Sequence, residues 1–117
     1  MKPLPSITKI LAGLFTAGLV WAPLPGLAAI DAEAAKDLSK KNDCVKCHAA
    51  NKDKKGPSLK KIADKHKGKA DAEDKLIKMM TSSPKVKMDD GTEEEHKAVN
   101  TKDPAALKNL AGWILSH

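Results

Sequence analysis

The stretch Cys44-Val45-Lys46-Cys47-His48 (CVKCH) decides how this chain folds. Its two cysteines are three residues apart, and a histidine follows the second cysteine directly. On one turn of chain, thiols at this spacing can each form a thioether with one of the two vinyl groups of a haem, and the next residue then lies under the iron. The stretch therefore predicts one haem c, attached covalently at Cys44 and Cys47, with His48 as an iron ligand.

Two other uses of a cysteine pair at this spacing fit the chain less well. A thioredoxin-like redox disulfide needs a parallel sheet, and this sequence has almost no strand signal. A zinc site needs two further ligands nearby, and the chain contains no second cysteine pair. Haem attachment is the favoured interpretation.

Residues 1–28 have the three-part layout of a secretory signal peptide. Lys2 and Lys9 make the start basic, Ile10–Ala22 is an uncharged apolar run, and a proline-containing segment ends in small residues that favour cleavage after Ala28. Export would place the protein in the bacterial periplasm, outside the cytoplasmic membrane, where haem c is attached. The apolar run is short for a membrane span, and a retained signal that acts as an anchor is the alternative.

Cleavage would leave residues 29–117 as a single small domain with a moderate positive charge. Removal of residues 1–28 takes away two lysines and no acidic residue, so the formal net charge falls from +6 to +4. Lysines alternate with acidic residues, arginine is absent, and Trp113 is the one aromatic residue left. This composition argues against nucleic-acid binding and suits brief docking on the acidic face of another protein.

Four segments have the helix-forming residues and end signals of short helices. They are residues 31–42, the segment from Ser58 to Gly68, the segment from Asp71 to Pro84, and the segment that begins at Asp103-Pro104. In the third segment, Asp74 is placed to act as a reciprocal partner of the Asp71 cap. Residues 43–48 are predicted as a turn, and Pro84–Thr101 as a long polar loop, which in a small domain usually has a function. The prediction is an all-α fold of four short helices that needs a large group to pack around.

Three stretches resemble those of small class I bacterial cytochromes c, and the resemblance covers most of residues 31–117. They are Lys40–Ala49 (KKNDCVKCHA), Gly56-Pro57, and Leu110–Ser116 (LAGWILS). The resemblance implies the class I cytochrome c fold, in which the first and last helices cross near the haem edge. The implied contacts are Ala34, Ala35 and Leu38 against Leu110, Ala111 and Ile114.

The same resemblance implies roles for two further residues near the haem. The Pro57 carbonyl would accept a hydrogen bond from the far ring nitrogen of His48, which fixes the tautomer of the ligand; an ordinary Gly-Pro turn is compatible with this role. Trp113 would pack beside the haem or a propionate, and a plain core position is the alternative.

The second axial ligand is left open between His96 and Met88, both within Pro84–Thr101. Family habit favours methionine, but Met88 is followed by a polar Asp-Asp-Gly stretch, whereas a ligating methionine normally lies in an apolar loop. The resemblance places the ligand close to the spacing of His96, which precedes Trp113 by seventeen residues. We therefore predict bis-histidine ligation, with Met88 and then an open site as the alternatives. The remaining candidates are assigned to helix faces, solvent or the terminus: Met79, Met80, His66 and His117.

The resemblance implies a soluble monohaem one-electron carrier that is not an enzyme, works as a monomer and binds redox partners transiently. Six lysines near the exposed haem edge would steer docking: Lys46, Lys52, Lys54, Lys55, Lys85 and Lys87. The alternative class is a haem-based ligand-binding or peroxidase-like protein, in which His96 is a labile ligand or distal base assisted by the acidic run before it. A haem module of a membrane complex would require the uncleaved anchor.

Overall fold

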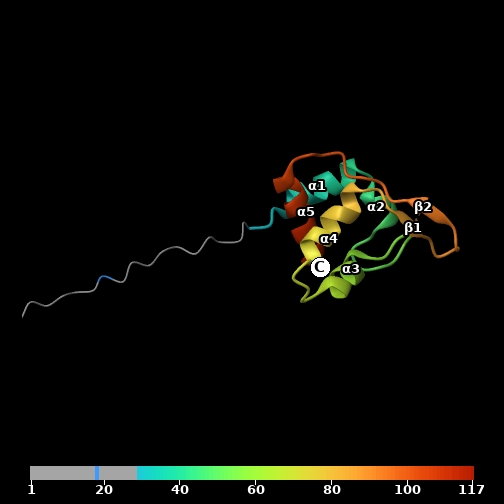
Figure 1. Ribbon diagram of the computed structural model, residues 1–117, viewed down its shortest axis with the longest axis horizontal. Coiled ribbons are helices and arrows are strands. Elements are labelled where there is room, and N and C mark those ends of the chain that lie inside the picture. The colour runs from blue at the N-terminus through green and yellow to red at the C-terminus, as the bar shows by residue number, and fades with distance from the viewer. Residues whose placement is uncertain (1–17, 19–28) are drawn as a thin grey trace, which may run out of the picture.

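The computed structural model of the protein describes Gly18 and residues 29–117. The predicted signal peptide, residues 1–28, therefore lies outside the described residues except for Gly18. Five helices and a two-stranded hairpin follow one another along the chain (Figure 1): α1 Ala32–Lys41, α2 Cys44–Cys47, α3 Leu59–His66, α4 Ala72–Thr81, β1 Lys85–Lys87, β2 Glu93–Glu95 and α5 Pro104–Leu115.

Side-chain caps start three of these helices where the sequence predicts. Asp31 accepts a hydrogen bond from the Ala34 N–H at 3.0 Å, and Ser58 accepts one from the Lys61 N–H at 3.2 Å. Asp103 accepts one from the N–H of Ala105 at 3.0 Å, with Pro104 in the first turn of α5. Each cap satisfies an amide that the helix itself leaves unpaired, which contributes about 1 kcal/mol.

Helix α4 starts at the predicted place but without the predicted reciprocal cap. The side chain of Asp71 makes no capping hydrogen bond. Its carboxylate instead lies 2.8 Å from the ammonium of Lys75, one turn into the helix. The prediction that Asp74 completes a capping box is therefore wrong, because the cap residue is engaged by a lysine side chain.

The core lies where α5 packs against α1, α3 and α4 (Figure 1). Ala35 and Ala111 are 1% and 0% exposed, and their small side chains let α1 and α5 approach closely. Asn109 of α5 also holds the start of α1, since its amide bonds both the N–H and the carbonyl of Asp31 at 2.8 Å. The predicted crossing of the first and last helices is confirmed, except that Ala34 is exposed and does not belong to it.

The segment Pro84–Thr101, predicted as an irregular loop, contains an antiparallel hairpin. Three residue pairs set its register: Lys85 with Glu95, Val86 with Glu94, and Lys87 with Glu93. A lysine lies opposite a glutamate in two of these pairs, an arrangement that favours pairing, although within residues 29–117 no ion pair joins the two strands. Gly91 provides the positive φ of 85° in the connection. The sequence has no strand signal here, because nearly all residues of the two strands are charged and exposed.

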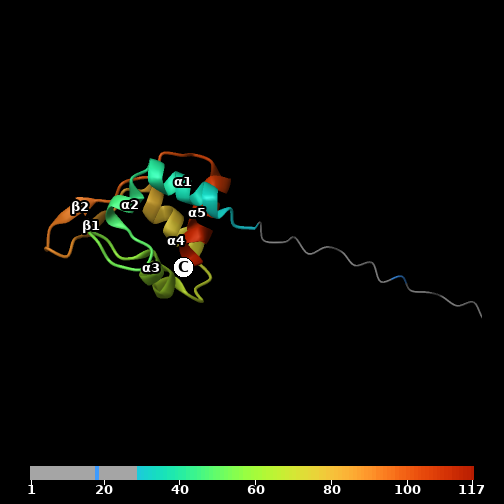
Figure 2. The same ribbon diagram turned by 180° about the vertical axis from the view of Figure 1, so that it is seen from behind.

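Helix α2 also replaces the turn that was predicted over residues 43–48. Figure 2 shows this short helix and the hairpin at the same end of the domain, as does the opposite view in Figure 1. Within Gly18 and residues 29–117, no helix combines the length and apolar character needed to cross a membrane.

Candidate functional site

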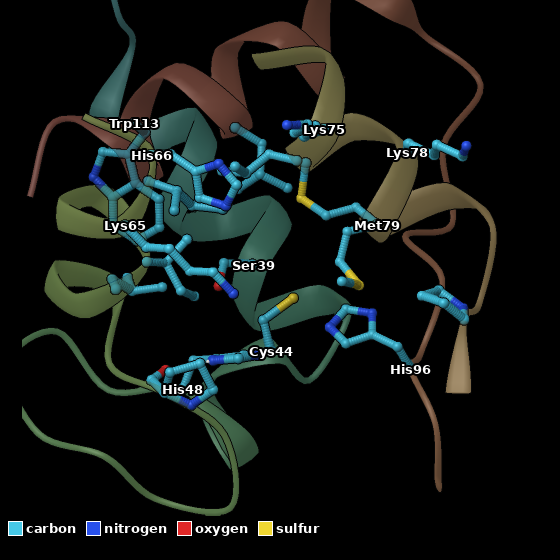
Figure 3. A pocket seen from close by; sticks show the side chains of 18 of the residues that line it. Ser39, Cys44, His48, Lys65, His66, Lys75, Lys78, Met79, His96 and Trp113 are labelled. Atoms are coloured by element: carbon cyan, nitrogen blue, oxygen red, sulfur yellow. Dashed lines mark hydrogen bonds between the residues drawn. The ribbon is translucent and has the colours of Figure 1, made fainter. Parts of the chain in front are cut away.

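A mainly apolar cavity of about 480 Å³ lies between the cysteine motif and helices α3, α4 and α5 (Figure 3). A second cavity of about 470 Å³ borders the motif and the hairpin. Both are lined by Cys44, His48, Pro57 and His96. Volumes of this size are typical of cofactor sites, so the cysteine motif and His96 face enough space for a large group.

The two cysteines stand at the first and last positions of α2, on one turn of helix. Both are free thiols of intermediate exposure, and Cys44 lines both cavities while Cys47 lines the second. Burial raises the pKa of the Cys44 thiol. The structure therefore presents two unpaired thiols beside one space, as attachment of one haem through two thioethers requires.

The imidazole of His48 is held by the loop that follows it. Its Nδ1 donates to the Pro57 carbonyl over 2.7 Å, which is the hydrogen bond that the sequence resemblance implies. A proton on Nδ1 leaves Nε2 as the nitrogen with a free lone pair. His48 is thus prepared to bind a metal through Nε2.

Gly56 is required by the close approach of this loop to His48. The Gly56 N–H donates to the Cys47 carbonyl at 2.9 Å, and a Cβ built at position 56 would lie 2.7 Å from Cε1 of the imidazole. No side chain fits in that gap unless the ring or the loop moves. Gly56 is therefore needed for the position of the His48 ring as well as for the Gly-Pro turn.

We expect Gly56→Ala to displace the His48 ring and to lower the free energy of unfolding by about 2 kcal/mol, as overpacking typically does. Denaturant unfolding and the absorption spectrum of the haem-loaded protein measure the two effects. Gly112→Ala is the matched control, because a Cβ there would meet Ile30 at an ordinary 3.5 Å. Equal stability of the two variants with an unchanged spectrum would contradict this account.

His96 follows β2 directly and turns its imidazole toward the space that His48 faces (Figure 3). The ring centroids are 6.1 Å apart and the planes are tilted by 46°. An imidazole nitrogen binds a metal ion at about 2 Å, with the ring centre roughly 1 Å beyond, so two imidazoles on opposite sides of one ion have centroids about 6 Å apart. The separation of the two rings suits ligation of a single iron.

The electrostatic surroundings of His96 also suit a metal ligand. Burial lowers the pKa of His96, and the neighbouring His48 lowers it further. A lowered pKa keeps the imidazole neutral at neutral pH, which is the form that binds a metal. Nδ1 of His96 is buried without a hydrogen-bond partner, so Nε2 is the nitrogen that a metal could reach.

Met88, the alternative ligand, lies in the connection of the hairpin. Its N–H donates to the Thr92 carbonyl at 2.8 Å and its carbonyl accepts from the N–H of Gly91 at 3.0 Å. Its side chain lines the second cavity but not the first, whereas His96 lines both. This placement favours His96 over Met88.

Trp113 of α5 is partly buried and lines the first cavity, as both of its predicted roles allow. His117 packs edge-on against its indole, with centroids 4.8 Å apart at 83°, and the His117 Nδ1 lies 3.0 Å from the Trp113 carbonyl. The last turn of α5 is therefore a fixed wall of the cavity.

His66 and Met79 line the first cavity, although the sequence did not predict that they face the haem. His66, expected in solvent, lines the first cavity with a buried, unpartnered Nδ1, and burial is the main cause that lowers its pKa. Met79 of α4 also lines this cavity and is 43% exposed (Figure 3). Helical spacing could have indicated His66, because Leu59, Ile62 and His66 share one face of α3.

Three lysines complete the lining of the first cavity (Figure 3): Lys65, Lys75 and Lys78. Haem has two propionates, and ammonium groups bind carboxylates by charge-assisted hydrogen bonds. Lys75 is paired with Asp71, whereas within residues 29–117 Lys65 and Lys78 make no ion pair. An apolar space with cationic groups in its wall fits a haem in both its apolar and its acidic parts.

Comparison with known proteins supports the same cofactor. The family model described as "Cytochrome c" matches residues 32–117. Cytochrome c-552 of Nitrosomonas europaea is 41% identical over 86 residues, which is 73% of this chain and 80% of the relative.

Two solved structures resemble the chain in fold. The class 1 cytochrome MtoD from Sideroxydans lithotrophicus ES-1 is 57% identical with a TM-score of 0.73, covering 75% of this chain and 97% of that one. Wild-type cytochrome c552 of Nitrosomonas europaea is 33% identical with a TM-score of 0.55, and the match covers 69% of this chain and 96% of that one.

Proposed function

Since the chain belongs to the cytochrome c family, has the class I fold and binds haem c through Cys44 and Cys47, we propose that it is a soluble periplasmic carrier of single electrons between redox proteins. In this proposal residues 1–28 are removed on export and the remaining domain works as a monomer. When bound, the haem supplies an iron that takes up or releases one electron.

The proposal assigns His48 and His96 as the two axial ligands. The observation that carries it is the pair of imidazoles with centroids 6.1 Å apart in one cavity. His48 is oriented by the Pro57 carbonyl, while helices α3, α4 and α5 supply the apolar wall of the cavity. With both ligands in place before the electron arrives, the protein has little to rearrange in the transfer.

One feature favours a second candidate function, a haem-based ligand-binding or peroxidase-like protein. The His96 ring has no hydrogen bond at its buried Nδ1, so it is held less firmly than His48 and could leave the iron. Carbon monoxide added to the reduced wild-type protein separates the two functions. Slow or absent binding supports the carrier, and rapid binding supports the alternative.

The exposed edge of the motif has the composition of a transient docking surface. Val45, between the two cysteines, is 46% exposed, and the Lys54 ammonium donates to its carbonyl at 2.6 Å. Within residues 29–117, no ion pair involves Lys52, Lys55, Lys85 or Lys87. A small apolar contact with a charged rim suits brief, salt-sensitive encounters with acidic partners.

We expect the variant with Lys55→Glu and Lys87→Glu to be reoxidised by the anion ferricyanide about tenfold more slowly than the wild type at low salt, because steering by these charges is lost. The difference should vanish at high salt. Stopped-flow absorbance measures the rates, and Lys108→Glu is the control, since Lys108 of α5 lines neither cavity. Wild-type rates that do not depend on salt would refute docking by lysines.

A further inference from the structure

The two proposed ligands are held in different ways. The ring of His48 is fixed by its own hydrogen bond to Pro57 at 2.7 Å, whereas the ring of His96 has no partner for its buried Nδ1. Because the Nδ1 bond is lacking, the position of the His96 imidazole depends more on the backbone that carries it.

Backbone hydrogen bonds hold the segment that carries His96 at two points. One goes to Pro84, just before β1, and the other goes to Met80 of α4. The His96 N–H donates to the Pro84 carbonyl at 2.8 Å, and the Val99 N–H donates to the Met80 carbonyl at 2.8 Å. Val99 is also part of the buried core at 7% exposure. These bonds hold the segment against Met80 of α4 and against Pro84, and neither of them reaches the cysteine motif.

Contacts from the two residues before Cys44 set that approach. The Asn42 amide is buried at 6% exposure; its Nδ2 donates to the Leu38 carbonyl at 2.9 Å and its Oδ1 accepts from the Asn100 N–H at 2.7 Å. Next to it, the Asp43 carboxylate accepts from the Lys97 ammonium at 2.6 Å. The Asp43 bond therefore reaches Lys97, the residue after His96. The Asn42 bond reaches Asn100, the fourth residue after His96.

We propose that Asn42 is a positioning residue for His96, with Asp43 in a lesser part; this inference rests on the proposed role of His96 as a ligand. Because Asn42 and Asp43 adjoin Cys44, the segment that attaches the haem on one side also places the ligand on the other. Asn42 has the greater effect, since its hydrogen bond is buried. The Asp43–Lys97 pair is solvent-exposed, with side chains 40% and 63% exposed, and Lys46 at 3.1 Å shares the carboxylate.

The rate at which carbon monoxide binds to the reduced, haem-loaded protein tests this role, because His96 must leave before the gas can bind. We expect Asn42→Ala to increase that rate about tenfold, the factor that follows from losing one buried hydrogen bond. Lys97→Met should change it by less than about threefold, as removal of an exposed ion pair does. Asn42→Asp keeps an oxygen for the Asn100 N–H but sets a buried carboxylate oxygen against the Leu38 carbonyl, which Nδ2 contacts at 2.9 Å in the wild type, so this variant should also increase the rate.

Leu107→Ala is the control for a merely structural effect. Leu107 is a core residue at 8% exposure that lines neither cavity, so the substitution should lower thermal stability and leave the carbon monoxide rate unchanged. An equal increase in Leu107→Ala and Asn42→Ala, or no increase in either, would overturn the positioning role. If His96→Ala itself leaves the rate unchanged, the ligand assignment fails; a large effect of His96→Ala with none of Asn42→Ala rejects the positioning role alone.

Discussion

We expect His96→Ala to change the reduced protein from one that binds carbon monoxide slowly or not at all to one that binds it within the mixing time. The substitution removes the proposed sixth ligand and leaves His48, with its bond to Pro57, as the single protein ligand. A five-coordinate ferrous haem then offers an open position to the gas. Absorbance changes after rapid mixing measure the rate.

Met88→Ala is the matched control, because Met88 is the alternative ligand and lines the second cavity with His96. We expect this variant to behave like the wild type. The near-infrared charge-transfer band that marks thioether ligation of ferric haem gives an independent check. Its presence in the wild type and its loss in Met88→Ala would reverse the assignment of the ligand.

A related substitution, His96→Met, tests how the ligand sets the potential. A thioether donates less to ferric iron than an imidazole does, so the reduction potential should rise by on the order of 0.1 V. Spectroelectrochemical titration of this variant beside the wild type measures the shift. A lower potential in His96→Met would contradict the ligand set.

The second large effect concerns the fold itself. We expect the variant with Cys44→Ala and Cys47→Ala, purified without haem, to lose most of its helical circular dichroism. Without haem, the mainly apolar wall of the first cavity, about 480 Å³ in volume, stays in contact with water, and each Å² of apolar surface left exposed forgoes about 25 cal/mol. A small domain has only about 5–15 kcal/mol of stability in all, so losing this burial removes a large part of it.

Two controls keep this result interpretable. Val45→Ala changes an exposed side chain of the same short helix and should leave haem attachment and the thermal midpoint unchanged. Haemin added to the double variant should restore part of the helical signal, since His48 and His96 remain. Native helicity and a native thermal midpoint in the haem-free double variant would show that the helices do not depend on the cofactor.

Local signals predicted most of the helical structure, because they act between residues close in sequence. The Asp31, Ser58 and Asp103 caps each accept a hydrogen bond from an amide two or three residues ahead. Residues close in sequence are therefore enough to predict where these helices begin. The hairpin after Pro84 was missed because its strands are charged and exposed, so they lack the apolar alternation that indicates a strand. The Asp71 cap failed through competition from Lys75.

The sequence by itself determined the chemistry of attachment, since two thiols and an imidazole at fixed spacing on one turn need no other part of the chain to define them. The resemblance predicted Pro57, His96 and Trp113 near the haem, but tertiary structure alone decided the distances between them and which further residues share the space around that turn. It brings the His96 ring to 6.1 Å from that of His48, places His66 and Met79 in the cavity wall, and joins Asn42 to Asn100 across 58 positions of sequence. The physical reason is that packing of α1, α3 and α4 on α5 sets distances between residues far apart in the chain, and no local pattern encodes them.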